Sequence, residues 1–67
     1  LEPAVATLSR VLEIDPTQDE ARFERAVVLE RQGRTAEARA GYERLGAAET
    51  RPDIRRAAAR RLAALPP

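Results

Sequence analysis

The chain contains no cysteine, histidine, lysine, tryptophan or methionine, and these absences remove most of the side chains that perform chemistry. Without cysteine there are no disulfides, no thiolate nucleophile and no thiolate-bound metal. Catalysis needs a nucleophile, a base or a metal within reach of one another. The chain offers one serine, Ser9, and one tyrosine, Tyr42, which the helix pattern places in a core position. We therefore expect no enzyme activity, no small-molecule substrate and no cofactor.

The net charge is also close to zero, because twelve arginines and eleven acids leave a formal charge of +1. No overall field demands a nucleic acid or a membrane surface. No apolar run approaches the ~20 residues of a spanning helix, so we expect no membrane span, while the compartment stays undecided. A chain of 67 residues allows one small domain, with a marginal core that buries about 60% of the unfolded surface.

Apolar residues recur at the spacing of amphipathic helices along the whole chain. Proline and glycine punctuate this pattern, because proline ends or begins a helix and glycine reaches the left-handed conformation that closes one. The pattern predicts an all-α fold of about four helices, over residues 3–14, 19–32, 35–45 and 52–64.

Polar residues predict where these helices begin and end. Thr17, Gln18 and Asp19 offer a cap for the second helix, and Thr35 offers one for the third. We expect Gly33 to end the second helix and Gly46 to end the third, with a loop over 47–51. Gly41 lies inside the third helix, where glycine costs about 1 kcal/mol relative to alanine, so we expect another backbone to approach it closely.

A repeat of about 34 residues runs through this pattern. Ala38, Tyr42 and Leu45 follow one another at i, i+4 and i+7, and Ala4, Leu8 and Val11 have the same spacing 34 residues earlier.

With Asp15-Pro16 closing the first helix, this order resembles the tetratricopeptide repeat. Ala26, Leu29 and Gly33 occupy the small, bulky and hairpin-glycine positions of that family's first helix. The resemblance implies antiparallel helical hairpins stacked as an α–α solenoid.

The resemblance also implies a division of the chain, 1–67, into one and a half repeats and a cap. Residues 1–16 would be the second helix of one repeat, 17–50 a complete repeat and 51–67 a capping helix. Stable arrays need about three repeats, so we expect a fragment of a longer chain or a homo-oligomer.

Two positions depart from the family pattern, since Arg22 and Arg25 stand where the family has Trp and Leu. We expect their aliphatic stems to pack and their guanidinium groups to reach Asp19, Glu20 or Glu24.

The family's activity implies a non-catalytic scaffold that binds a peptide or helix of a partner protein, or that self-assembles. The helix that resembles the groove-lining helix would present Phe23, Val27 and Glu30, with Thr17 and Gln18 at the rim. The alternative for Phe23 is that it packs against a neighbouring helix. The corresponding places lack the Lys, Asn and Arg clamp with which some members grip a terminal carboxylate. We expect apolar contacts with basic rather than acidic additions, and expect Phe23→Asp to abolish capture without changing helix content.

Two alternatives remain open. The chain could be a structural appendage of a larger enzyme or of an envelope assembly or secretion protein. It could also bind nucleic acid through the five arginines of residues 51–61, although aromatic platforms and base-reading side chains are missing.

Asp15, Asp19 and Glu20 flank the proline turn, as a cation site or as acids at helix ends. No calcium-type loop accompanies these residues, so we expect no metal.

Overall fold

A computed structural model describes residues 2–47 and 49–66 of the chain. Within them lie four helices of 13 residues each and no strand, which confirms the all-α prediction. The helices are α1 (Glu2–Ile14), α2 (Asp19–Arg31), α3 (Thr35–Ala47) and α4 (Pro52–Ala64). Positions 1, 48 and 67, on which the predicted domain ends and the 47–51 loop partly depend, lie outside the described residues.

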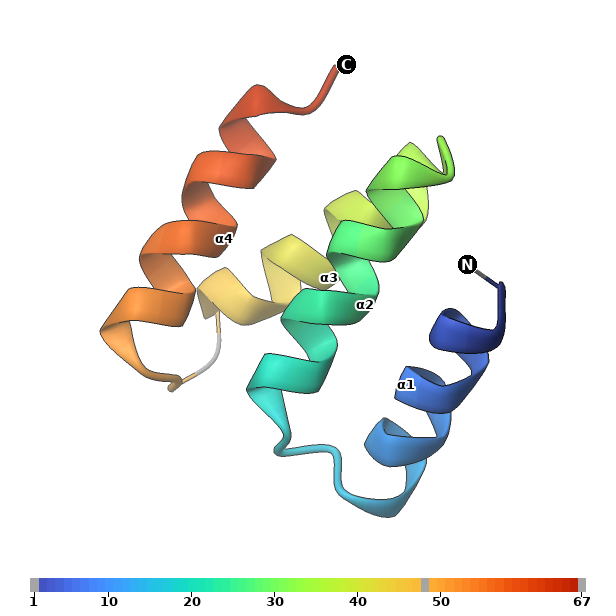
Figure 1. Cartoon of the computed structure of the whole chain (residues 1–67). Coiled ribbons are helices and arrows are strands. Elements are labelled where there is room, and N and C mark those ends of the chain that lie inside the picture. The colour runs from blue at the N-terminus through green and yellow to red at the C-terminus, as the bar shows by residue number, and fades with distance from the viewer. Residues whose placement is uncertain (1, 48, 67) are drawn as a thin grey trace.

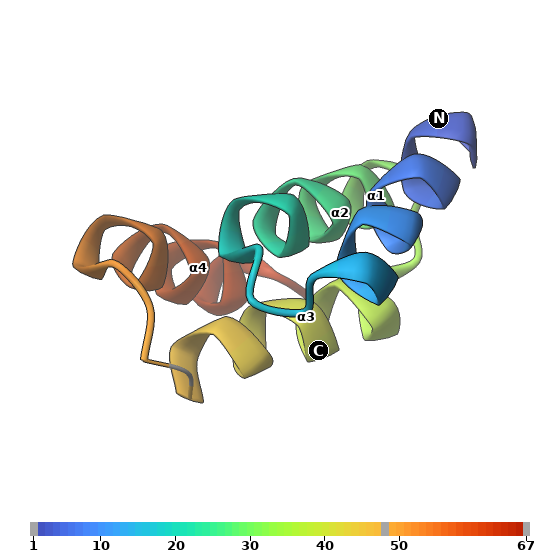
Figure 2. The same cartoon turned by 90° about the horizontal axis from the view of Figure 1, so that it is seen from below.

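Successive helices run in opposite directions and α2 lies at the centre of the molecule (Figure 1). It packs against α1 on one side and α3 on another, and α4 packs mainly on α3 with a smaller contact to α2. From below, α3 lies beneath α2 (Figure 2). The result is a row of two antiparallel pairs, α1 with α2 and α3 with α4, joined through the α2–α3 contact.

The core lies where α2, α3 and α4 meet. Leu29, Tyr42 and Leu45 are its largest side chains and are fully buried. Ala26, Ala38 and Ala58 lie between them, so the helix axes approach closely, as the alanine-rich composition indicates. Burying each large side chain contributes roughly 1.5–3 kcal/mol. The core therefore depends on a few contacts, most of them made by α3.

Gly41 permits the close approach of α2 and α3 that its sequence position predicts. A Cβ atom built on Gly41 would stand 3.2 Å from the Cβ atom of Ala26 and 4.0 Å from its Cα atom. Such a separation is tighter than ordinary packing allows, so any side chain at position 41 would press on α2.

The hairpin between α2 and α3 turns at Gly33, as predicted. Gly33 has a φ of 79°, the left-handed region in which glycine carries no Cβ penalty. The amide of Arg34 donates to the carbonyl of Leu29 at 2.9 Å, which satisfies a carbonyl that the end of α2 would leave unpaired. The helix itself ends at Arg31, one residue before the predicted end.

Gly46, in contrast, does not end α3, and that prediction is wrong. The helix continues through it to Ala47. Among the described glycines only Gly33 has a positive φ, so Gly46 keeps a helical conformation. The Thr35 cap is wrong too, because Thr35 is already the first helical residue and the carbonyl of Arg34 accepts from the amide of Ala38 at 3.1 Å.

The start of α2 also differs from the prediction, since no side chain caps it. Gln18 holds the capping position, but its side chain makes no capping hydrogen bond to the helix. The carboxylate of Asp15 attracts the polar groups instead. Its Oδ1 accepts from the amide and the hydroxyl of Thr17, at 3.0 and 2.6 Å, and its Oδ2 accepts from Gln18 Nε2 at 3.3 Å. These hydrogen bonds lower the pKa of Asp15, and the bond from the Thr17 hydroxyl has the largest effect.

Candidate functional site

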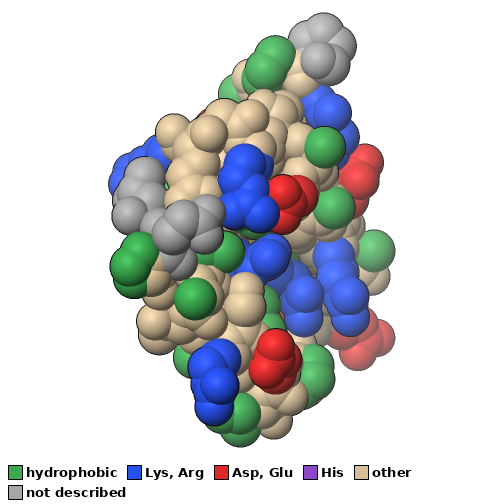
Figure 3. Space-filling model, turned by 90° about the vertical axis from the view of Figure 1, so that its right-hand side faces the viewer, with side chains coloured by type: hydrophobic (Ala, Val, Ile, Leu, Met, Phe, Trp, Pro, Cys, Tyr) green, Lys and Arg blue, Asp and Glu red, His purple; other side chains and the backbone are tan. Residues whose placement is uncertain are grey.

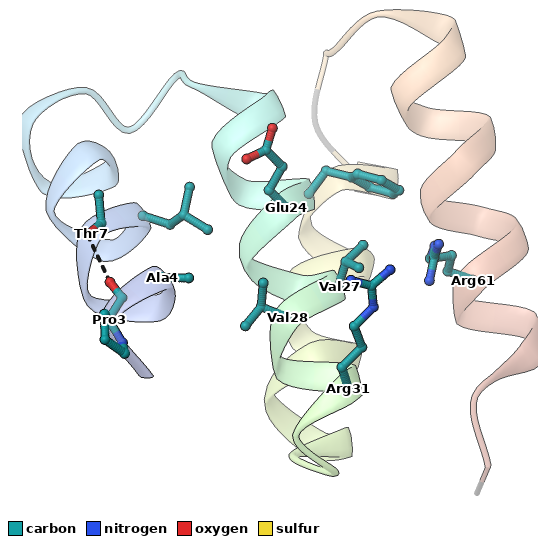
Figure 4. Close-up of a pocket in the computed structure, with 10 residues that line it drawn as sticks. Pro3, Ala4, Thr7, Glu24, Val27, Val28, Arg31 and Arg61 are labelled. Atoms are coloured by element: carbon teal, nitrogen blue, oxygen red, sulfur yellow. Dashed lines mark hydrogen bonds between the residues drawn. The ribbon is translucent and has the colours of Figure 1, made fainter. Parts of the chain in front are cut away.

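An open groove of about 660 Å³ lies between α1 and α2 (Figure 4). We call it the α1–α2 groove. Its α1 wall is formed by Pro3, Ala4, Thr7 and Leu8, and its α2 wall by Phe23, Glu24, Val27, Val28 and Arg31, with Arg61 of α4 at the far edge. Six of these ten side chains are apolar, and the four polar ones are Thr7, Glu24, Arg31 and Arg61. The groove can therefore bury apolar surface while its ends hold charge.

The groove is open because α1 exposes the kind of face that α3 buries. Ala38, Gly41 and Tyr42 lie on the buried face of α3, where Gly41 meets α2. The residues 34 positions earlier are Ala4, Thr7 and Leu8. They line the groove, where Ala4 and Leu8 are half-buried and Thr7 is exposed. In the internal repeat, this face of α1 is thus the equivalent of the face with which α3 packs on α2.

Phe23 forms part of the groove wall and of the core at once. Its ring centroid lies 5.9 Å from that of Tyr42, with an angle of 57° between the ring planes. The Arg61 guanidinium carbon lies 5.9 Å from the same ring, within the range of a cation–π contact. Replacing Phe23 with Asp would consequently remove core packing as well as groove surface, so helix content is not expected to stay unchanged.

Glu30 is engaged inside the molecule. Its Oε1 accepts a hydrogen bond from the Tyr42 hydroxyl at 2.8 Å and lies 3.5 Å from Arg61 Nη1. Burial, followed by the hydrogen bond to Glu30, raises the pKa of Tyr42 to about 12. This cluster ties α2, α3 and α4 together and does not line the α1–α2 groove.

Thr17 and Gln18 lie in the turn before α2 and do not line the groove. They border a smaller hollow of about 280 Å³, together with Glu49, Thr50 and Arg51. Of the five residues predicted for a binding groove, the structure thus brings Phe23 and Val27 together in one wall. Sequence reasoning missed the α1 wall, Val28 and Arg31. The signal that could have found the α1 wall is the repetition of the Ala38, Gly41 and Tyr42 face in Ala4, Thr7 and Leu8.

The charges around the groove differ from those that the sequence suggested. Glu20 lies 3.0 Å from Arg51 and Glu30 is held by Tyr42 and Arg61. Glu24 and Arg31 are exposed, and neither makes an ion pair with another described residue. The side-chain charges left to meet a ligand are therefore an acid at one end and a base at the other.

Arg22 and Arg25 do not reach the acids as predicted. Arg22 Nη2 donates to the carbonyl of Pro16 at 2.8 Å, and Arg25 Nε donates to the Ser9 hydroxyl at 2.8 Å. Burial, followed by repulsion from Arg44, lowers the pKa of Arg22. The two side chains join α2 to α1 and to the turn before α2, and α1 is the neighbour that the family's apolar residues would otherwise contact.

On the flank that Figure 3 shows, which is the α1 side of the molecule in Figure 1, several arginines gather near the middle beside a few acids. The arginines of α4 lie on the other side of the molecule (Figure 1). Among the arginines predicted as a nucleic-acid surface, Arg51 pairs with Glu20 and Asp53, and Arg61 with Glu30. Arg55, Arg56 and Arg60 are exposed.

The described residues hold no cluster of three or more His, Cys, Asp or Glu side chains that could bind a metal ion. None of their helices is long and apolar enough to cross a membrane.

Comparison with known proteins identifies one family. The model of the tetratricopeptide repeat matches residues 2–64, nearly the whole chain and all four helices. No curated protein and no solved structure matches. Repeats of this family generally mediate protein–protein interaction and are typically non-catalytic scaffolds.

Proposed function

Because the chain belongs to the tetratricopeptide repeat family, we propose that it is a non-catalytic module that binds a helix of a partner protein in the α1–α2 groove. The observation that carries this proposal is the face of α1 that contains Ala4, Thr7 and Leu8. It repeats the face with which α3 packs on α2, and it lines an open groove. A helix supplied by a partner would cover it.

The chemistry of the groove supports binding rather than catalysis. Its walls are aliphatic and aromatic, and its only charged side chains are Glu24, Arg31 and Arg61. Such a surface gains affinity by removing apolar area from water, at roughly 25 cal/mol per Å² before the costs of association. An amphipathic helix with anchors at i, i+3, i+4 and i+7 has the matching shape.

The division of the chain forms part of the same proposal. Residues 1–16 act as the second helix of a repeat, 17–50 as a complete repeat and 51–67 as the cap. In this division α1 is the second helix of its repeat. If a second copy of the chain fills the groove, or if the chain is only a structural appendage, the chain is expected not to bind an added helical peptide.

The test uses helical peptides selected from a displayed library on the 67-residue chain, with affinity measured by fluorescence anisotropy. We expect Leu8→Glu to weaken a selected peptide at least tenfold, since burying a leucine contributes roughly 1.5–3 kcal/mol and 1.4 kcal/mol is a factor of ten. Ile14→Glu is the matched control on the same helix, because Ile14 is 81% exposed and outside the groove.

A second variant separates binding from folding. Thr7 is exposed, so Thr7→Arg would fill the groove without disturbing the core. We expect it to weaken the peptide while circular dichroism and thermal unfolding match the wild type. Equal affinity of wild type, Leu8→Glu and Thr7→Arg for the peptide would reject the groove.

A further inference from the structure

A further hollow, of about 350 Å³, lies where α1, α2 and α3 meet. Its polar lining consists of Arg22 and Arg25 of α2, Arg44 of α3, and Ser9 and Glu13 of α1, and we call it the arginine hollow. The view from below shows the turn before α2 above α3, where these elements come together (Figure 2). The hollow therefore gathers arginines that lie far apart in the sequence.

The arginine hollow is separate from the α1–α2 groove. Successive residues of a helix are rotated by about 100° around its axis. Arg22 and Arg25 therefore lie on the other side of α2 from Phe23 and Val27, which line the groove. Neither the hollow nor its charges depend on what occupies the groove.

The arginines bring more positive charge to the hollow than nearby acids neutralise. Glu13 is the one acid among its described lining residues, and it is exposed. Arg22, Arg25 and Arg44 make no ion pair with a described residue. Burial, followed by repulsion from Arg44, lowers the pKa of Arg22; Asp19 opposes this shift and Arg25 adds to it. Since arginine stays charged in proteins, a bound anion would relieve the repulsion.

Two of the three guanidinium groups are already held in place. Arg22 Nη2 donates to the Pro16 carbonyl at 2.8 Å, and Arg25 Nε donates to the Ser9 hydroxyl at 2.8 Å. Each arginine has five N–H groups, so most of them remain available to a ligand. Both side chains are half-buried, and groups that are already ordered lose little freedom on binding. Arg44 is exposed, so its side chain can turn toward a ligand from α3.

We propose that the arginine hollow binds a phosphate group, as inorganic phosphate or as a small monoester. Planar guanidinium groups match the oxygens of phosphate through paired, charge-assisted hydrogen bonds. The Ser9 hydroxyl accepts from Arg25 and keeps its own hydrogen to donate. Arg22 and Arg25, the two departures from the family pattern, thus form the α2 side of an anion site.

The test follows phosphate binding by the 67-residue chain through its arginine Nε–H signals in NMR spectra. Inorganic phosphate and phosphoserine are separate probes, each titrated at an ionic strength held constant with sodium chloride. We expect saturable shifts of the Arg22 and Arg44 signals with at least one probe. A response to both, to phosphate alone or to phosphoserine alone supports the site and identifies the source of the phosphate group.

Variants at exposed positions test the site without disturbing the core. Arg44→Gln should weaken binding roughly fivefold to tenfold, because it removes charge-assisted hydrogen bonds. Arg60→Gln is the matched control, since it removes one exposed arginine of α4 outside the hollow, and it should leave the affinity unchanged. Glu13→Gln removes the acid of the hollow and should strengthen binding about twofold to threefold. Circular dichroism checks that all three variants keep their helix content.

Two results would overturn the inference. Shifts that do not saturate, or that chloride alone reproduces, would show only screening of surface charge. Equal weakening by Arg44→Gln and Arg60→Gln would attribute binding to the overall charge rather than to the arginine hollow. Neither result affects the proposed function, because its test uses helical peptides and variants of the α1–α2 groove.

Discussion

At the scale of single residues, Tyr42 connects the core to the ion pairs around it. Its ring is fully buried against Phe23, and its hydroxyl donates to Glu30, which also pairs with Arg61. It is the only tyrosine of the chain, so its ionisation can be observed without overlap from other tyrosines. Residues of three helices therefore respond to one titratable group.

We predict that Tyr42 titrates near pH 12 in the folded protein. Burial and the hydrogen bond to Glu30 raise the pKa from 10.0 to about 12 and so favour the protonated phenol. The stabilisation that this group gives is complete below pH 10, and it is lost as the pH rises from 10 to 12. Tyrosinate absorbance measures the titration of Tyr42, and circular dichroism recorded at the same time measures the loss of helical structure. A midpoint near 10 with unchanged helix content would contradict the burial of the hydroxyl.

Predictions for single residues succeeded where one requirement of the backbone decides the conformation. They failed where several polar groups compete for the same hydrogen-bond partner. Gly33 was predicted correctly, because the hairpin needs a positive φ. The cap of α2 was predicted wrongly. The Thr17 hydroxyl and the Gln18 side-chain amide, which were expected to cap the helix, donate hydrogen bonds to the Asp15 carboxylate instead. Such local competition depends on the conformation of the turn, which the sequence pattern does not specify.

At the scale of helices, α3 makes a close contact with α2 at Gly41 and has open space beside Gly46. Gly41 lies against Ala26, whereas a Cβ atom on Gly46 would meet nothing within 4 Å. Both glycines are in the same helix with helical conformation. Replacing Gly46 therefore measures the helix propensity of glycine alone, whereas replacing Gly41 also measures the effect of the tight contact with α2.

We predict opposite benefits from alanine at these two positions. Gly46→Ala should raise the free energy of unfolding by about 0.5–1 kcal/mol, the usual difference in helix propensity. Gly41→Ala should gain clearly less or lose stability, because its Cβ atom presses on Ala26, and Gly41→Val should destabilise by roughly 1–3 kcal/mol. Urea unfolding of the three variants gives the comparison. Equal stabilisation by both alanines would show that α2 and α3 are not in close contact.

Helix positions were predictable to within two residues, since apolar spacing and proline limit them strongly. The error at the end of α3 arose because a glycine can also continue a helix when no left-handed turn is required. The partners of Arg22 and Arg25 were not predictable, since the Pro16 carbonyl and the Ser9 hydroxyl come within reach only after α1 and α2 pack.

At the scale of the whole molecule, the repeat explains both the fold and the site. The helices α2 and α3 pack against each other, and α4 packs on α3. The equivalent face of α1 lines the groove. Of the five residues expected in a binding groove, the sequence could indicate Phe23 and Val27 from helix periodicity. It could not indicate that Arg61 of α4 would engage Glu30, because that pairing depends on the packing of α4 beside α2.

The most direct test of the account is a backbone amide NMR titration of the 67-residue chain with a helical peptide that binds it. We predict that the largest shifts fall on Ala4, Thr7 and Leu8 of α1 and on Val28 and Arg31 of α2. Shifts concentrated instead at Thr17 and Gln18, or on the exposed arginines of α4, would contradict the claim that α1 and α2 form the binding groove.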